Sequence, residues 1–242
     1  MDFKKEVEHR VQWIKDVIKS AGAKGIVLGM SGGKDCALVG ILAKMATPNV
    51  VGIVMPCESS KNYKEDRDDA ISLCNKFDIQ VEEVDLTNIK KLFRQVLEPL
   101  APENPPIAYE NINPRLRMIT LYNYAQRKGY LVAGTGNKSE RTMGYFTKWG
   151  DGAYDLNPIG DLVVSEIYEL LEYLGCPENI IKKAPSAGLY EGQTDEIDMG
   201  IKYEDLDRYI LTGVGAKENI EKIESTFKKT EHKRNIGRIY PN

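Results

Sequence analysis

The chain has 242 residues and a formal net charge of −3 at pH 7. This length suits one large α/β domain with added helices, and the slightly acidic balance gives no reason to expect nucleic acid as an obligatory partner. Four cysteines without metal spacing and two histidines argue against a zinc site and predict reduced thiols. We find no apolar signal segment and no run near the ~18 residues of a membrane span. We therefore expect a cytoplasmic protein without a membrane partner.

Apolar residues recur every three or four positions in the first 22 residues, so this segment predicts an amphipathic helix that ends at Gly22. The pattern does not decide whether the helix packs on its own sheet or on a second subunit. Four strands are then predicted to alternate with helices, at 26–28, 50–55, 79–85 and 130–134. This alternation over 25–175 predicts a doubly wound, mostly parallel sheet of Rossmann-like type, with helices on both faces.

The connecting segments complete the predicted single domain of residues 1–242. Thr87 is expected to cap one helix, the proline-rich residues 98–112 to form a loop, and Pro114 to begin the helix that follows. Residues 184–198 read as a possible mobile lid, and residues 200–242 as C-terminal helices and a tail.

The glycine-rich segment 25–36 joins the first predicted strand to a helix. Such a turn lets the backbone approach an anion while the unpaired amides of the helix point at it, so it favours a phosphate site. A Walker A loop would need Gly where Leu28 stands and Ser or Thr where Asp35 stands, and a dinucleotide GxGxxG would need Gly in place of Ser31 and Lys34. A turn without any ligand remains the alternative.

A second polar segment follows the fourth strand, at residues 135–140. Because ligands bind at the carboxyl edge of open α/β sheets, Asp35 and Glu140 are expected to face one another across a crevice. Glu140 could instead be an ordinary carboxylate at a helix start. Residues 141–160 are rich in glycine, aromatic residues and isolated charges, and so long a loop is usually functional.

Taken together, several motifs resemble the ammonia-dependent NAD synthetases over about residues 25 to 235. The segment Ser31-Gly32-Gly33-Lys34-Asp35-Cys36 is similar to the SGGxDS pyrophosphate loop of the ATP pyrophosphatases. The other motifs occur in the family's order and are Gly-Thr-Gly-Asn-Lys-Ser-Glu (134–140), Gly-Tyr-Phe-Thr-Lys-Trp-Gly-Asp-Gly-Ala-Tyr-Asp-Leu-Asn-Pro (144–158), Ala-Pro-Ser-Ala-Gly-Leu (184–189), Gln-Thr-Asp-Glu (193–196) and Thr-Glu-His-Lys-Arg (230–234). The resemblance implies the adenine nucleotide α-hydrolase type of fold.

The resemblance also implies a reaction, in which ATP adenylates the carboxylate of deamido-NAD and ammonia then forms the amide, with AMP and pyrophosphate released. Asp35 and Glu140 match magnesium ligands, and Asp35 and Lys148 are the catalytic candidates. The matching ATP-binding positions are Gly29, Met30, Ser31, Gly32, Gly33, Lys34, Asp35, Cys36, Thr135 and Ser186. The matching deamido-NAD positions are Arg115, Lys148, Asp155, His232 and Lys233. From the residues alone, the two hydroxyls of Thr135 and Ser186 could cap local turns, and 231–234 could be a solvated tail.

Two positions depart from the family pattern. Cys36 replaces a serine, and Val164 stands where the family usually carries a lysine that contacts the ATP phosphates. Since a charge-assisted contact is commonly worth ~1.5–3 kcal/mol, we expect Val164→Lys to raise activity or ATP affinity unless Lys34, Lys138 or the lysines at 182 and 183 compensate.

Alternatives to this function remain at this stage. One is another ATP-pyrophosphatase ligase, and another is a non-catalytic adenine-nucleotide-binding protein on the same sheet. The resemblance implies a homodimer, in which His232 and Lys233 act at a site shared between subunits. The chain has no room for an added glutaminase-like module of ~300 residues, which favours free ammonia or a separate donor protein.

Overall fold

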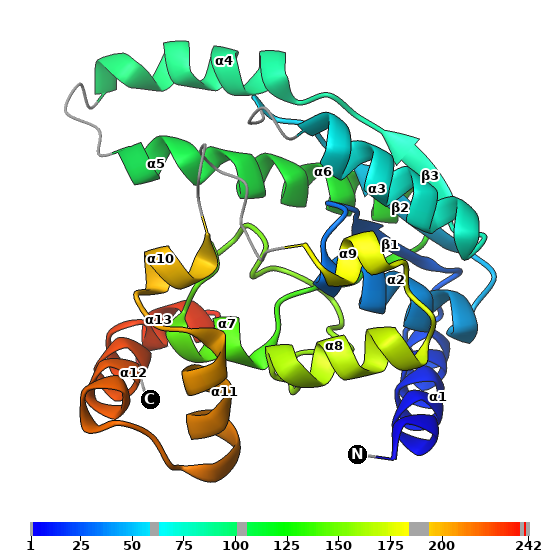
Figure 1. The fold of residues 1–242 in the computed structure, drawn as a ribbon. Coiled ribbons are helices and arrows are strands. Elements are labelled where there is room, and N and C mark those ends of the chain that lie inside the picture. Colours follow the sequence, from blue (N-terminus) through cyan, green and yellow to red (C-terminus); the bar gives the residue numbers. More distant parts are fainter. Residues whose placement is uncertain (1, 59–62, 101–105, 184–193, 238–239, 241–242) are drawn as a thin grey trace.

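The computed structural model describes residues 2–58, 63–100, 106–183, 194–237 and 240. Within these ranges, all strands are parallel and belong to one sheet with the order β3-β2-β1-β4 (Figure 1). The strands are β1 (Ile26–Gly29), β2 (Val50–Val54), β3 (Gln80–Glu83) and β4 (Leu131–Val132). Ile26 of β1 aligns with Val50 on one side and Leu131 on the other. The predicted parallel α/β sheet is therefore confirmed.

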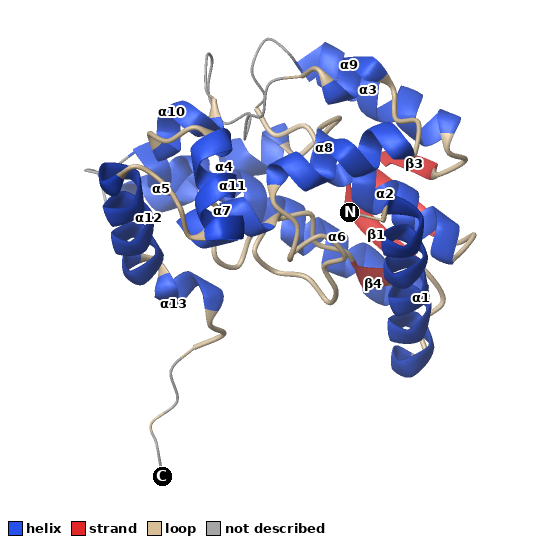
Figure 2. Cartoon of the chain, turned by 60° about the horizontal axis from the view of Figure 1, so that its bottom comes forward, coloured by secondary structure: helices blue, strands red, loops and turns tan. Residues whose placement is uncertain are grey.

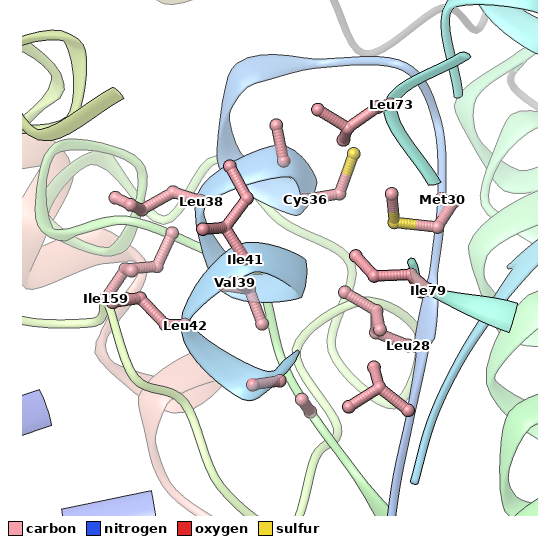
Figure 3. Close-up of a cluster of buried hydrophobic side chains, with 14 of the residues drawn as sticks. Leu28, Met30, Cys36, Leu38, Val39, Ile41, Leu42, Leu73, Ile79 and Ile159 are labelled. Atoms are coloured by element: carbon pink, nitrogen blue, oxygen red, sulfur yellow. The ribbon is translucent and has the colours of Figure 1, made fainter. Parts of the chain in front are cut away.

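Helices cover both faces of this sheet, because successive side chains of a strand point to opposite sides. Ile26 and Leu28 belong to an apolar cluster formed with α1 (Phe3–Ala21), α2 (Lys34–Ala46) and α8 (Val164–Tyr173). Val27 belongs to a second cluster, formed with α6 (Ile112–Lys128) on the other face. Figure 3 shows part of the first cluster, where side chains of α2 pack against Leu28 and Met30. The prediction of helices on both faces is confirmed.

The N-terminal helix packs on its own domain. Val7, Val11 and Ile14 of α1 are buried in the first cluster, and Gly22 ends the helix in the left-handed conformation, as predicted. Arg10 is only 8% exposed and pairs with Asp161, which lies just before α8. The alternative that α1 needs a second subunit to cover its apolar face is not supported by this packing.

Two local predictions between β3 and β4 are wrong. Thr87 is the first residue of α4 (Thr87–Leu97) rather than its cap. Residues 98–112 are not simply a loop, since their described part carries a 3₁₀ turn (Glu98–Leu100), α5 (Pro106–Glu110) and the start of α6. Pro114 is the third residue of α6, where no intrahelical donor is required, so the helix can begin two residues earlier. The remaining helices of this half are α3 (Tyr63–Lys76), α7 (Lys138–Met143) and α9 (Glu178–Ile181).

The C-terminal helices gather against α7 and α8, away from α1 (Figures 1 and 2). They are α10 (Asp195–Met199), α11 (Tyr203–Thr212), α12 (Lys217–Lys229) and α13 (Glu231–Arg234). A third apolar cluster that includes Met143, Val164 and Leu206 packs α10, α11 and α12 against α7 and α8, and α13 contacts α12. Of the predicted lid, residues 184–193 lie outside the described residues, and residues 195–199 form α10. In the described ranges, no helix has the length and apolar character needed to cross a membrane.

Candidate active site

The glycine-rich loop leaves β1 and enters α2 at the carboxyl edge of the sheet. Gly29 ends β1, and Gly33 caps α2 without a side-chain hydrogen bond, which leaves the first amides of the helix available. Gly32 has φ of +75°, and a Cβ at that position would lie 2.3 Å from the carbonyl oxygen of Asp66. Only glycine fits there without movement of α3. This geometry suits an anion held by backbone amides and by the helix dipole.

Cys36 and Met30 are buried side chains of this loop segment and pack below its surface. The Cys36 thiol lies 3.4 Å from the backbone nitrogen of Ser31, which donates to it, and itself donates to the Gly33 carbonyl at 3.1 Å. Cys36 and Met30 are both buried (Figure 3), whereas Ser31 is exposed. Cys36, in place of serine, therefore holds the loop through these two contacts. The Ser31 hydroxyl accepts from the Gly33 backbone nitrogen at 3.3 Å and lies 3.4 Å from the Cys36 sulfur.

Asp35 and Glu140 meet through one asparagine. The Nδ2 atom of Asn137 donates to Asp35 Oδ1 at 3.1 Å, and the Asn137 backbone nitrogen donates to Glu140 Oε2 at 2.9 Å. Asn137 also caps α7 and accepts from the Glu140 amide, so the two residues form a capping box. Glu140 is thus a carboxylate at a helix start, which was the alternative to a ligand role. It also faces Asp35 from α7, so the two interpretations are compatible.

The ammonium group of Lys34 lies inside this acidic site. Lys34 is 5% exposed, and its Nζ atom contacts Asp35 Oδ2 at 2.8 Å and lies 5.7 Å from the ring centroid of Tyr203. Tyr203 also donates from its hydroxyl to Asp195 Oδ2 at 3.0 Å, and the buried Asp195 Oδ1 has no hydrogen-bond partner among the described residues. One ammonium group therefore faces the carboxylates of Asp35, Glu140 and Asp195.

Burial and mutual repulsion dominate the electrostatics of the acidic site. Burial, and then the Asp35 charge, raise the pKa of Glu140 well above its usual value. Burial also raises the pKa of Asp195. For Lys34, burial lowers the pKa, but the Asp35 and Glu140 carboxylates outweigh burial and raise it. The carboxylates of this buried site repel one another, and a further cation would stabilise their charged forms.

These carboxylates fit a magnesium ion that is shared with a phosphate group. Magnesium prefers oxygen ligands and is usually held by one or two carboxylates together with phosphates and water. Asp35 and Glu140 supply two carboxylates at the mouth of the loop. In the part of the chain that the structure describes, no three acidic, histidine or cysteine side chains are arranged to hold a metal by themselves. The remaining ligands would have to come from the substrate and from water.

A second group of predicted residues lies together and comes from α6, the loop after α7 and α13. Lys148 Nζ donates to the carbonyl of His232 at 2.6 Å, and Arg115 Nη2 donates to the carbonyl of Lys148 at 3.4 Å. Lys233 Nζ donates to the carbonyls of Gly144 and Phe146 at 2.8 and 2.9 Å. The four predicted substrate-binding residues Arg115, Lys148, His232 and Lys233, far apart in the sequence, are thus brought to one place.

Asp155 is held separately, at the end of β4. Its carboxylate accepts from the Val132 backbone nitrogen at 2.8 Å and from the Tyr122 hydroxyl at 3.2 Å. A small cavity of about 60 Å³ has both Glu140 and Lys233 in its lining, and so joins the acidic site to the basic group. The two predicted halves of the site are therefore neighbours.

Three further predicted positions differ in outcome. Thr135 is half-buried just after β4, and its hydroxyl makes no hydrogen bond within the described ranges, so it remains free for a ligand. Ser186 lies outside the described residues. Val164 is 3% exposed in the third apolar cluster, with its backbone nitrogen 3.4 Å from the Ser139 hydroxyl. The expectation that this position is short of a cation is not supported, because its surroundings are apolar and Lys34 already places an ammonium group beside Tyr203 of the same cluster.

Asn137, Asp195 and Tyr203 also belong to the site, although no role for them was predicted from the sequence. The spacing of Asn137 and Glu140 is that of a capping box, so this signal was available. Asp195 lies in a quoted motif but had no role, and nothing in the sequence places Tyr203 beside Lys34. Both arrive from the C-terminal helices, through contacts that depend on tertiary packing.

A parallel α/β sheet with a glycine-rich anion loop, paired carboxylates and a neighbouring basic group defines a nucleotide-binding protein of the adenine nucleotide α-hydrolase class. Residues 6–237 match the family model described as NAD synthase. An NH(3)-dependent NAD(+) synthetase of Carboxydothermus hydrogenoformans is 44% identical over 241 residues, which cover 99% of this chain and 98% of the relative. The chain belongs to the NAD synthase family.

Solved structures agree with this assignment. An NMN synthetase from Francisella tularensis has a TM-score of 0.93 and 34% identity, with 100% of this chain and 99% of that one covered. An NH3-dependent NAD synthetase from Campylobacter jejuni has a TM-score of 0.81 and 33% identity, with 100% of both chains covered. The similarity extends over the whole chain in both cases.

Proposed function

We propose that this chain is an ammonia-dependent NAD synthetase, a ligase that uses ATP and magnesium to amidate deamido-NAD, with AMP and pyrophosphate as the other products. Full-length similarity to NAD synthetases supports the reaction. The observation that carries the proposal is the placement of Asp35 and Glu140 on either side of Asn137, at the mouth of an anion loop. A protein that only binds nucleotides has no need of such a carboxylate pair.

The loop and α2 would bind the ATP phosphates. The amides at the start of α2 and the exposed Ser31 would hold the departing β- and γ-phosphates. Asp35 and Glu140 would hold magnesium, which supplies charge stabilisation for phosphoryl transfer when it is bound. Thr135, which follows β4, would meet the nucleotide with its hydroxyl.

The basic group would bind the second substrate. Deamido-NAD carries two phosphates and a carboxylate, and Arg115, Lys148 and Lys233 offer cations to them. The substrate carboxylate attacks the α-phosphorus of ATP and pyrophosphate leaves. Ammonia then attacks the activated carbonyl carbon, loses a proton and displaces AMP. Lys148, which is tied to the His232 carbonyl, is the residue we propose to position that carboxylate.

A direct assay tests this function. Purified protein is mixed with ATP, magnesium, deamido-NAD and ammonium chloride, and NAD and pyrophosphate are measured together. Equal amounts of both products are expected, and Asp35→Asn should stop both. Binding of ATP without pyrophosphate release would favour the nucleotide-binding alternative. Pyrophosphate release that does not depend on deamido-NAD would favour a different ligase.

Nicotinate mononucleotide is a second candidate for the acceptor. The Francisella tularensis structure with the TM-score of 0.93 is described as an NMN synthetase, and the same chemistry would apply to the shorter substrate. Because relatives of 40–45% identity over nearly the full chain are described as NAD(+) synthetases, we expect the dinucleotide to have the higher kcat/KM. Parallel assays with the two acceptors decide between them, and a higher kcat/KM for the mononucleotide would reverse the assignment.

We further propose that the enzyme is a homodimer that works in the cytoplasm as one domain of residues 1–242. Support for a dimer comes from α4, where Leu92 and Val96 are 58% and 63% exposed and form part of an apolar face. Such a face is commonly covered by a partner. The variant Leu92→Glu should be monomeric in light scattering, whereas Val214→Glu, at a separate exposed apolar position, should not change the mass. If His232 and Lys233 act at a site shared between subunits, the monomeric variant should lose activity. Full activity of a demonstrated monomer would contradict the shared site.

A further inference from the structure

The ammonium group of Lys34 is a buried charge among carboxylates. Lys34 belongs to the proposed phosphate loop, yet its side chain is buried. Its Nζ atom contacts Asp35 Oδ2 at 2.8 Å, while Asn137 Nδ2 donates to Asp35 Oδ1 at 3.1 Å. Both oxygens of the proposed metal ligand Asp35 are therefore engaged in this state, one by a cation.

The surroundings of Lys34 hold its ammonium group at this position. The side chain is 5% exposed, the Tyr203 ring lies beside Nζ, and Asp195 approaches from α10 with one buried oxygen that has no hydrogen-bond partner in the described ranges. An ammonium group buried among carboxylates is stabilised by them, and removal of either partner leaves an unbalanced charge. Lys34 is thus a built-in counter-ion for the acidic site.

On the basis of the proposed magnesium and ATP sites, we propose that Lys34 couples metal binding to nucleotide binding by occupying Asp35 until a triphosphate arrives. Without a triphosphate, a divalent cation must compete with the ammonium group for Asp35 and is also repelled by it. Phosphate oxygens offer Lys34 an alternative partner at the adjacent loop, which releases Asp35 for the metal. Because coupling is reciprocal, the metal in turn strengthens triphosphate binding.

The test uses metal binding rather than turnover. Mn²⁺ is titrated into the nucleotide-free protein and followed by electron paramagnetic resonance, for the wild type, Lys34→Gln and Lys44→Gln. Lys44 is the matched control, because it lies on the same helix about 15 Å away and pairs with Asp78 rather than with the site. We expect Lys34→Gln to bind Mn²⁺ at least about tenfold more tightly than the wild type, and Lys44→Gln to match the wild type.

A second titration follows inorganic triphosphate in the absence of metal, by calorimetry. Here Lys34→Gln should bind at least about tenfold more weakly, because the loop has lost the ammonium group that would transfer to the phosphates. The opposite signs of the two effects distinguish this role from a general loss of structure. Equal Mn²⁺ affinity in Lys34→Gln and the wild type would overturn the proposal.

Two measures keep the test decisive if Lys34→Gln folds poorly. Lys34→Met keeps an apolar stem in the same buried space and should also bind Mn²⁺ more tightly. The wild type is itself informative, since Mn²⁺ binding that is as tight without triphosphate as with it would also refute the proposal. Neither titration needs deamido-NAD, ammonia or catalysis, so a failed amidation assay and a failed coupling test lead to different conclusions.

Discussion

Replacement of Val164 by lysine tests whether a cation is missing from α8. Family resemblance favours a gain in ATP affinity, but the structure predicts a loss of stability instead. Val164 is 3% exposed and is packed with Met143, Tyr203 and Leu206. It is also the first residue of α8, where the helix dipole disfavours a positive charge.

The expected cost follows from these surroundings. Removing a fully buried valine from an apolar cluster costs about 1.5–3 kcal/mol, and burying an ammonium group in the same apolar space adds to it. We expect the free energy of unfolding to fall by roughly 2–4 kcal/mol, which corresponds to a fall in Tm of roughly 5–15 °C for a chain of this size. ATP affinity should not increase, because Lys34 already supplies the cation beside Tyr203.

Urea unfolding and ATP calorimetry measure the two quantities on the same samples. Val164→Ala is the control, since it removes two methyl groups without adding a charge and should cost about half as much. Both expectations for Val164→Lys are wrong if this variant is as stable as Val164→Ala and binds ATP more tightly than the wild type. That result would mean that the new lysine reaches the phosphate loop and that the position is short of a cation.

Further predictions concern the carboxylates and the loop. Glu140→Gln should slow pyrophosphate release at least about a hundredfold, because a neutral amide cannot hold a metal ion as a carboxylate does. An unchanged rate would exclude Glu140 as a metal ligand. The hydrogen bond from Arg10 lowers the pKa of Asp161 in the folded protein. The pair therefore stabilises the fold at pH values above the pKa that Asp161 has in the unfolded chain. This stabilisation is lost as the pH falls through the lower pKa of the folded state. Asp161→Asn should therefore cost about 1 kcal/mol in urea unfolding at about pH 7 and almost nothing at about pH 3, and a constant difference would contradict this. Gly32→Ala should lower the free energy of unfolding by about 2–3 kcal/mol and abolish triphosphate binding, because its Cβ would lie 2.3 Å from a carbonyl oxygen of α3. Gly22→Ala is the control, since Gly22 has φ of +62° but a Cβ there would have nothing within 4 Å. It should cost less stability and leave triphosphate binding unchanged.

The chain order of the elements could be predicted from local pattern alone. Periodicity located α1, and Gly22 ends it, because a left-handed residue after a helix is a local requirement that glycine meets best. The apolar runs located β1 and β2, and the glycines of 29–33 marked the anion loop before any contact was known. The N-terminal helix, the two strands and the anion loop depend on residues that are close in sequence, so their positions could be predicted without any tertiary contact.

Tertiary structure decided which charges meet. Lys34 is read from the sequence as a phosphate ligand, but Asp195 and Tyr203, more than 150 residues later, surround its ammonium group and turn it toward Asp35. Likewise, the apolar side of α4 looks like a core face, yet Leu92 stays exposed because no described element packs over it. Both outcomes depend on which surfaces the folded chain brings together. Local pattern states that a side chain is charged or apolar, and only the assembled structure determines its partner.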